Sequence, residues 1–252
     1  MDPTRLYETF SALEDPNILQ SAFIKFYNAW FYQDRWTMYV DGLITTVEVT
    51  VMALILGVIL GVVVATIRTA HDQQRPGHRN PFLGIINAIC KVYVTVIRGT
   101  PMMVQLMIMG FVVFASSRNK TMVGVLSLGI NSGAYVAEII RGGIEAVDKG
   151  QMEAARSLGL PYKKAMWKII LPQAFRTMLP SIINQFIISL KDTSLISVIG
   201  PRELTQNGKI IAANSSTRVM AIWIVVALFY LVVCTILSRV AKLVERKVSY
   251  GK

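Results

Sequence analysis

Long uncharged stretches alternate with short charged ones along most of this chain. Three of them run for about 19 or 20 residues without a charged side chain, which is the length that an α-helix needs to cross a bilayer. The stretch that ends before Glu138 is slightly shorter. The stretch around residues 177–199 is interrupted by Lys191 and Asp192 before it continues. The pattern predicts five membrane-spanning helices. The predicted spans cover about residues 42–67, 88–116, 121–144, 177–199 and 218–241.

Composition and the placement of charge support a membrane protein with a defined orientation. Hydrophobic residues make up 53% of the chain and charged residues only 16%, against about 25% in soluble domains. Of the 26 Lys and Arg residues, 15 fall in segments 68–81, 141–176 and 237–252, and 9 fall on the other side of the predicted spans. The positive-inside rule therefore predicts an external amino terminus and a cytoplasmic carboxyl terminus. The net charge of +11 does not indicate nucleic-acid binding, because no aromatic and basic module accompanies it.

Residues 1–41 precede the first predicted span and contain one amphipathic segment. From Asn17 to Trp30 apolar side chains recur at helical spacing, while polar side chains, including that of Lys25, share the other face. We expect a helix at the outer membrane surface, with Trp30 and Trp36 among the lipid headgroups. The alternative is a sixth span that runs through Lys25.

Polar residues form stripes along the predicted spans. In the first span Asp41, Thr45 and Glu48 are spaced at i, i+4 and i+7, and the third span has a similar stripe that ends at Glu138. A charge at the bilayer centre costs at least about 2.5–3.5 kcal/mol, so we expect these residues to face the protein interior or a water-filled path. The second span is broken at Arg98-Gly-Thr-Pro101. Such breaks are tolerated at membrane depth where they line a cavity or are buried in protein.

Two interpretations of these polar residues stay open. Charges of both signs along one route suit a zwitterionic substrate, with Arg98 for its carboxylate and acidic side chains for its ammonium group. Alternatively, Arg98 pairs with Glu138 or Glu48 as an interior strut, and Lys191 with Asp192 marks a helix end. Polar stripes or breaks in four spans together favour a translocation path.

A basic, helix-prone segment lies between the third and fourth predicted spans, on the predicted cytoplasmic side. Gly159 and Pro161 separate two short helices, of which the first closes with Glu153–Leu158 and the second runs from Pro161 through Ile170. The second helix has an apolar face that we expect to be exposed and to bind a protein partner, because such residues dominate interface energetics. This face consists of Leu160, Tyr162, Met166, Trp167 and Ile170.

The same segment resembles a known motif. The EAA motif of permease subunits of ATP-binding-cassette (ABC) importers, EAA-x3-G-x9-I-x-L-P, is matched at every fixed position by Glu153, Ala154, Ala155, Gly159, Ile169, Leu171 and Pro172. Three other segments resemble the polar amino acid permeases, the histidine and glutamine group. These segments are Val96–Gln105, Asn131–Gly143 and Leu190–Leu195, and the resemblance extends over about Gly42–Arg246.

This resemblance implies an all-α integral membrane protein with the type I ABC importer permease fold. Five transmembrane helices would form a permease domain over residues 42–246, and residues 149–172 would form a cytoplasmic coupling-helix hairpin, the EAA loop. The implied location is the bacterial plasma (inner) membrane, as a multi-pass subunit that works by alternating access. The expected partners are an ABC ATPase subunit dimer, a second permease subunit (identical or homologous), an extracytoplasmic amino-acid-binding protein and the lipid bilayer. ATP and Mg would bind to the partner ATPase, so we expect no cofactor in this chain.

The resemblance also implies roles for individual residues. In the family the hairpin sits in a groove of the ATPase subunit, and the residues expected to couple it are Glu153, Ala154, Ala155, Gly159, Tyr162, Met166, Trp167, Leu171 and Pro172. Some members also hold an amino acid within the permease. The residues expected to line such a substrate pathway are Glu48, Arg98, Thr100, Asn131, Glu138, Lys191 and Asp192.

Other functional classes fit the sequence less well. The Walker A, HExxH and CxxC signatures do not occur, so we expect neither an enzyme nor a metal site. A stand-alone secondary amino acid carrier is the alternative, which the number of spans, the lack of an inverted repeat and the hairpin disfavour. A non-transporting scaffold would leave the polar stripes unexplained.

Overall fold

The computed structural model describes residues 3–13, 15–74, 80–214 and 219–249, and within these ranges the chain forms helices joined by turns. Elements η1 and η4 are 3₁₀-helical, and η2 and η3 are π-helical. In chain order the elements are α1 (Pro3–Ser11), α2 (Ile18–Trp30), η1 (Tyr32–Asp34), α3 (Arg35–Asp72), α4 (Pro81–Gly99), α5 (Met102–Ile108), η2 (Met109–Val113), α6 (Lys120–Glu145), α7 (Lys149–Ser157), α8 (Tyr162–Ala165), η3 (Met166–Ile170), α9 (Leu171–Asp192), η4 (Thr193–Ile199), α10 (Leu204–Ala213) and α11 (Val219–Ser249).

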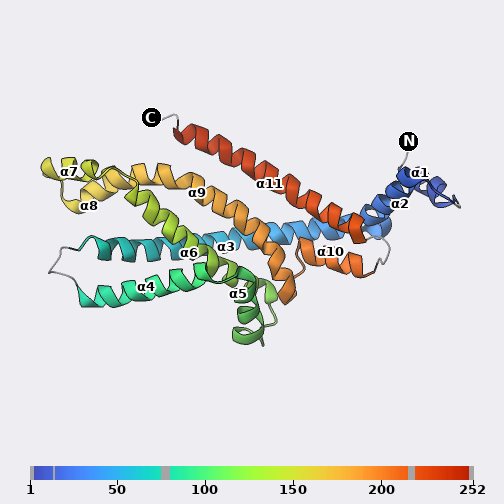
Figure 1. Cartoon of the computed structure of the whole chain (residues 1–252), viewed down its shortest axis with the longest axis horizontal. Helices are drawn as coiled ribbons and strands as arrows, with labels where there is room; N and C mark the ends of the chain where they lie inside the picture. Colours follow the sequence, from blue (N-terminus) through green and yellow to red (C-terminus); the bar gives the residue numbers. More distant parts are fainter. Residues whose placement is uncertain (1–2, 14, 75–79, 215–218, 250–252) are drawn as a thin grey trace.

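Five helices in the described part of the chain are long and apolar enough to cross a membrane. They are α3 with η1, α4, α6, the continuous helix from α8 through η4, and α11. Helix α2 has 13 residues, too few to cross a bilayer, so the sixth span through Lys25 is not formed. Helices α7 and α8 lie at one end of the molecule, called the hairpin end below, and α1, α2 and α10 lie at the opposite, amino-terminal end (Figure 1).

Helices α3 and α6 form the centre of the bundle, and glycines allow their close contact. A Cβ atom on Gly57 would lie 2.7 Å from Cβ of Ser132 and 3.3 Å from the carbonyl oxygen of Gly129. One turn further along α3, a Cβ atom on Gly61 would lie 2.5 Å from Cγ1 of Val136. Small residues at a spacing of four let helix backbones approach closely within a membrane. These glycines therefore serve packing within the subunit.

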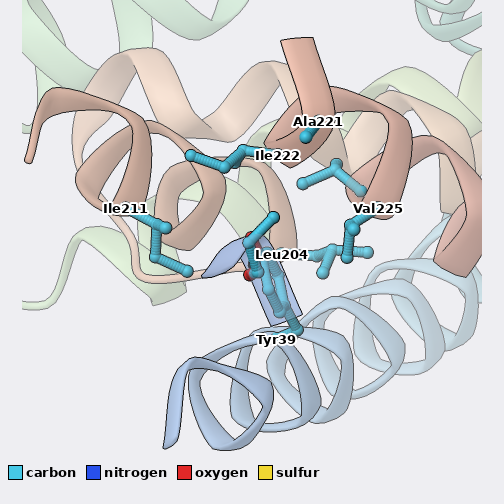
Figure 2. Packing of buried hydrophobic residues seen from close by; sticks show 8 residues of the cluster. Tyr39, Leu204, Ile211, Ala221, Ile222 and Val225 are labelled. Atoms are coloured by element: carbon cyan, nitrogen blue, oxygen red, sulfur yellow. Dashed lines mark hydrogen bonds between the residues drawn. The ribbon is translucent and has the colours of Figure 1, made fainter. Parts of the chain in front are cut away.

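At the amino-terminal end, α10 and the first turns of α11 pack across α3 (Figure 2). Tyr39 of α3, Leu204 of α10 and Ile222 of α11 are fully buried at the centre of this cluster. The rings of Trp30 and Phe229 stack with their centroids 5.4 Å apart, which attaches α2 to α11. The amino-terminal helices are therefore docked on the bundle.

A buried carboxylate starts α10. The side chain of Glu203 is fully buried and accepts hydrogen bonds from the backbone N–H groups of Thr205 at 2.7 Å and Gln206 at 2.6 Å. The hydroxyl of Tyr230 in α11 donates to the same carboxylate at 3.1 Å. This helix cap fixes the start of α10 and also connects it to α11.

The predicted helix over Asn17–Trp30 is present as α2, and Asn17 caps its start. The Asn17 side chain accepts a hydrogen bond from the N–H of Gln20, and the Gln20 side chain accepts one from the N–H of Asn17, which forms a capping box. Its placement at an outer membrane surface stays a prediction.

The second predicted span, residues 88–116, is divided into α4 and a second helical segment made of α5 and η2. Helix α4 begins seven residues earlier, at Pro81, where the Asn80 side chain accepts a hydrogen bond from the N–H of Phe82. Helix α4 ends at Gly99 and α5 begins at Met102, so the helix is interrupted at the position that Pro101 predicts. The apolar residues beyond the break form α5 and η2, which extend the bundle beside α6 (Figure 1).

The second hairpin helix does not end at Ile170, as the sequence predicts, but continues into the fourth span. The π-turn η3 joins them, with the N–H of Leu171 donating to the carbonyl oxygen of Met166. This wider turn accommodates Pro172, which has no N–H to donate, without ending the helix. The hairpin is therefore connected to the fourth span by helix rather than by a loop.

Candidate functional site: a charged cavity and an exposed hairpin

Glu138 on α6 is the centre of an ionic cluster that joins three helices. Its carboxylate pairs with Arg68 of α3, with Nη2 of Arg141 at 3.1 Å and with Nη1 of Arg98 of α4 at 3.6 Å. The Glu138 side chain is 18% exposed and that of Arg98 is 43% exposed. The Arg98 guanidinium also lies over the Tyr135 ring, 5.3 Å from its centroid. The pair of Arg98 with Glu138 that the strut interpretation requires is therefore present.

A cavity of about 280 Å³ opens beside this cluster, between α3, α4 and α6. On α4, Lys91, Thr95 and Arg98 follow one another at i, i+4 and i+7, so they share one face of the helix. Cationic side chains on a membrane-spanning helix must face water, protein or a ligand. The cavity is lined by Arg68, Lys91, Val94, Thr95, Arg98 and Glu138.

A hydrogen-bond network closes the break between α4 and α5. Nε2 of Gln105 donates to the carbonyl oxygen of Ile97 at 2.7 Å, to that of Thr100 at 3.1 Å and to Oγ1 of Thr100 at 2.8 Å. The Asn131 amide of α6 donates to Oε1 of Gln105 at 3.0 Å. Two residues of the predicted pathway, Thr100 and Asn131, are thus connected through the side chain of Gln105.

The other predicted pathway residues lie outside this cavity. Glu48 is exposed on α3, while Thr46 and Thr50 are the buried polar residues next to it in sequence. Lys191 and Asp192 occupy the last turn of α9, where the α-helix passes directly into the 3₁₀-helical turns of η4. None of the ion pairs within the described ranges includes Glu48, Lys191 or Asp192. Of the two positions expected for Glu48, the interior of this subunit is not the one observed, because the packing face of α3 runs through its glycines and threonines; a place on a water-filled path stays a prediction.

Three charged residues and one amide residue of the cavity and its surroundings are missing from the sequence prediction. Arg68 and Arg141 stand near helix ends, in segments counted as cytoplasmic, and nothing local connects them to Glu138. Lys91 could have been found from its i, i+4, i+7 spacing with Thr95 and Arg98. Gln105 had a weaker signal, a polar residue four positions after a proline that breaks a span.

Gly159 ends the first helix of the hairpin. Its φ of +80° lies in the left-handed region, which favours glycine. The N–H of Leu160 donates to the carbonyl oxygen of Ala155 at 3.1 Å, and that of Gly159 donates to the carbonyl oxygen of Arg156 at 3.0 Å. This pair of bonds is the Schellman motif, with glycine in its usual place. The bend predicted at Gly159 is present.

The hairpin exposes large apolar side chains at the end of the molecule. Trp167 is 73% exposed and Leu158 is 83% exposed. Tyr162 and Met166 line a cavity of about 350 Å³ between the hairpin and the end of α6. Ile170, predicted on the exposed apolar face, is buried, because η3 turns it inward. The exposed part of the predicted face therefore centres on Trp167.

The remaining motif residues divide between the surface and the interior of the hairpin. Ala155 is buried, and its small side chain lets α7 pack against α8 and η3. Glu153 lines the same cavity as Met166, while Ala154 and Pro172 are exposed. Leu171 is half-buried.

Five apolar spans, a charged cavity beside a broken span and an exposed hairpin at one end define a membrane-embedded transport subunit. A protein family described as binding-protein-dependent transport system inner membrane component matches residues 57–250. The chain belongs to this family and is the permease subunit of an ABC importer, with the fold predicted from its sequence. The stand-alone carrier finds no support in these comparisons.

Individual relatives cover most of the chain. It is 42% identical over 167 residues to the glutamine transport system permease protein GlnP of Escherichia coli (strain K12), an alignment of 65% of this chain and 76% of that protein. It is 35% identical over 217 residues to the L-cystine transport system permease protein TcyB of Bacillus subtilis (strain 168), across 85% of this chain and 88% of that protein. The crystal structure of an amino acid ABC transporter with histidines matches with a TM-score of 0.74 and 38% identity, over 84% of this chain and 94% of that chain.

Proposed function

We propose that this chain forms the path for a polar amino acid across the bacterial plasma membrane, as one of two permease subunits driven by an ATPase dimer. The cavity beside the Glu138 cluster carries the proposal, because an amino acid has both a carboxylate and an ammonium group and the cavity offers charges of both signs. Relatives named as glutamine and cystine permeases support the same substrate class.

Within the cavity, Arg98 is the group best placed to receive the substrate carboxylate. Its pair with Glu138 is the longest of the three that the cluster contains, and its side chain is the most exposed of them. A guanidinium can bind a carboxylate through two parallel hydrogen bonds, which would replace the long contact to Glu138. Arg68 and Arg141 keep Glu138 in place, so its carboxylate can then face the substrate ammonium group.

Further pathway residues belong to this proposal. Thr100 lies in the break next to Arg98, and Asn131 is connected to Thr100 by the hydrogen bonds that both make with Gln105. Glu48 and Lys191 are exposed on the isolated subunit and Asp192 is half-buried. They would line the path where a second permease subunit, identical or homologous, faces this one.

The ATPase would drive transport by moving the hairpin end of the subunit. Closure of the ATPase dimer around ATP and Mg would move the hairpin, and the helix that continues from α8 to η4 would carry this movement into the bundle. The path would then open alternately to each side. The excess of Lys and Arg in segments 68–81, 141–176 and 237–252 supports a cytoplasmic position for the hairpin, with the amino terminus outside, where a binding protein delivers the amino acid.

Co-purification tests the coupling surface. The tagged subunit, purified gently from native membranes, should bring an ABC ATPase in stoichiometric amount, identified by mass spectrometry. Trp167→Glu should reduce that ATPase strongly, because a charge replaces an exposed aromatic anchor. Trp36→Glu is the matched control, since Trp36 is exposed at the opposite end of the molecule. Normal ATPase recovery with Trp167→Glu would contradict the docking role.

Uptake by the purified complex in liposomes tests the substrate pathway. With its binding protein outside and ATP on the other side, the complex should take up at least one of radiolabelled L-glutamine, L-cystine and L-arginine only when ATP is present. Glu138→Gln should change the half-saturating amino acid concentration while the complex still assembles. Uptake that proceeds without ATP would contradict the proposal, and unchanged kinetics would return Glu138 to a structural role.

A further inference from the structure

Gln105 supplies the hydrogen bond that Pro101 cannot make. In a continuous helix the N–H of residue 101 would donate to the carbonyl oxygen of Ile97, but proline has no N–H. The Gln105 side chain donates to that same oxygen at 2.7 Å. At the neighbouring position the backbone of Thr100 is extended, with φ −121° and ψ 147°, and its hydroxyl donates to the carbonyl oxygen of Val96 at 2.8 Å.

These contacts determine which way the Gln105 amide points. Its NH₂ group faces three oxygen atoms, two of them carbonyl oxygens of Ile97 and Thr100 that can only accept. Its oxygen accepts from the side-chain amide of Asn131, a residue of α6 that is only 7% exposed. The break is therefore closed by one amide that both replaces a missing backbone donor and connects α4 and α5 to α6.

We propose that Gln105 is a positioning residue for the substrate pathway. It holds the chain at the break, so that Arg98, three residues before Pro101, enters the cavity at the end of α4 beside Glu138. Gln105 itself does not line the cavity. This inference rests on the proposed function, because it assigns Gln105 a role in how Arg98 meets a substrate carboxylate.

Two substitutions of similar size test the role in the whole complex. Gln105→Met removes the hydrogen bonds, and Gln105→Glu directs a carboxylate oxygen at the carbonyl oxygens of Ile97 and Thr100. Because Gln105→Met removes every hydrogen bond of this side chain, we expect it to raise the half-saturating concentration at least about threefold, and Gln105→Glu to raise it further. The maximal rate per assembled complex and the ATPase activity without amino acid should change little. The probe is whichever of L-glutamine, L-cystine and L-arginine the wild-type complex takes up.

Gln20→Glu is the matched control. Its side-chain oxygen accepts a hydrogen bond from the N–H of Asn17 at 2.9 Å, and a carboxylate accepts equally well, so kinetics should stay at wild-type values. Thr100→Val provides a milder variant. It removes the hydroxyl that donates a hydrogen bond to the carbonyl oxygen of Val96 and accepts one from Nε2 of Gln105. It should raise the half-saturating concentration less, and its effect should not add fully to that of Gln105→Met.

Three results would overturn the inference. Gln105→Met and Gln105→Glu with wild-type kinetics would show that the break needs no amide. A loss of assembled complex in these variants and in Thr100→Val, with normal kinetics in what remains, would show a purely structural role. A fall in maximal rate at an unchanged half-saturating concentration would place Gln105 in a later step of transport. If the wild-type complex takes up none of the three amino acids with ATP, the proposed function itself fails.

Discussion

Helices α6 and α11 are both long and apolar enough to cross a membrane, yet α6 is largely buried in the subunit and α11 is largely exposed. Along the apolar stretch of each helix, 67% of the residues are buried in α6 and 22% in α11. Helix α11 is nevertheless the more apolar of the two. Apolar character therefore does not indicate which span lies at the centre, because lipid tails are as apolar as a leucine side chain.

Side-chain size explains the difference better. Helix α6 carries small residues along its contact with α3, and they let the two backbones meet. Helix α11 is buried at its first turns, near Ile222 and Val225, where α10 and α3 cover it (Figure 2). Beyond Tyr230 five of its large apolar side chains are exposed, while Val233, Leu237 and Val244 are half-buried. These exposed residues are Leu231, Val232, Ile236, Val240 and Leu243.

The buried start of α11 gives the largest expected effect. Ile222→Ala should lower the free energy of unfolding by about 2–5 kcal/mol, because Ile222 is fully buried and the cavity left behind cannot close completely. Denaturant or thermal unfolding of the purified subunit in detergent measures the change. A loss below about 1 kcal/mol would mean that α10 and α11 can repack, and the distinction between the two halves of α11 would weaken.

The glycine contact of α6 comes next. Gly61→Ala should destabilise the subunit by about 1–3 kcal/mol, because the new methyl group would lie 2.5 Å from Cγ1 of Val136. Gly84→Ala is the matched control in α4, since a Cβ atom there has no other atom within 4 Å. That control should be neutral or stabilising by up to about 1 kcal/mol, as alanine favours helix. Equal effects of both substitutions would contradict close packing of α3 on α6.

The carboxylate that connects α10 to α11 should make stability depend on pH. Burial raises the pKa of Glu203 above its usual range, although the N–H groups of Thr205 and Gln206 and the hydroxyl of Tyr230 offset part of the rise. A raised pKa in the folded state contributes stability that is complete below the unfolded value of about 4.3. This contribution is lost as the pH rises through the folded value.

Wild-type protein should therefore lose stability relative to Glu203→Gln as the pH is raised from about 4. Thermal unfolding of both proteins over the same pH series gives this difference directly. A difference that stays constant across the series would show that Glu203 titrates alike in the folded and unfolded chain.

Sequence signals predicted the local features well. Pro101 and Gly99 predict the break in the second span, and Gly159 predicts the bend of the hairpin, because each restricts or frees the backbone where it stands. The capped start of α2 at Asn17 is local in the same sense. In these places the decisive residue and the structural feature lie within one helical turn of each other.

Features that depend on packing could not be predicted in the same way. Arg68 pairs with Glu138 across 70 positions of sequence, and only the placement of α3 beside α6 brings them together. The exposure of Glu48 depends on which face of α3 the glycines bury. The burial of Ile170 follows from a π-turn, which shifts every later side chain around the helix relative to the predicted register.

The exposed half of α11 gives the smallest expected effect and the sharpest use of the comparison. Leu231 is 61% exposed, so Leu231→Ala should change the free energy of unfolding of the isolated subunit by less than about 0.5 kcal/mol. Ile222→Ala in the same helix is its control, since it makes a similar truncation where α11 is covered. The pair should then be measured in the assembled complex. A loss at Leu231 that appears only there would show that another chain covers this half of α11, whereas a loss already present in the isolated subunit would contradict the exposure on which the comparison depends.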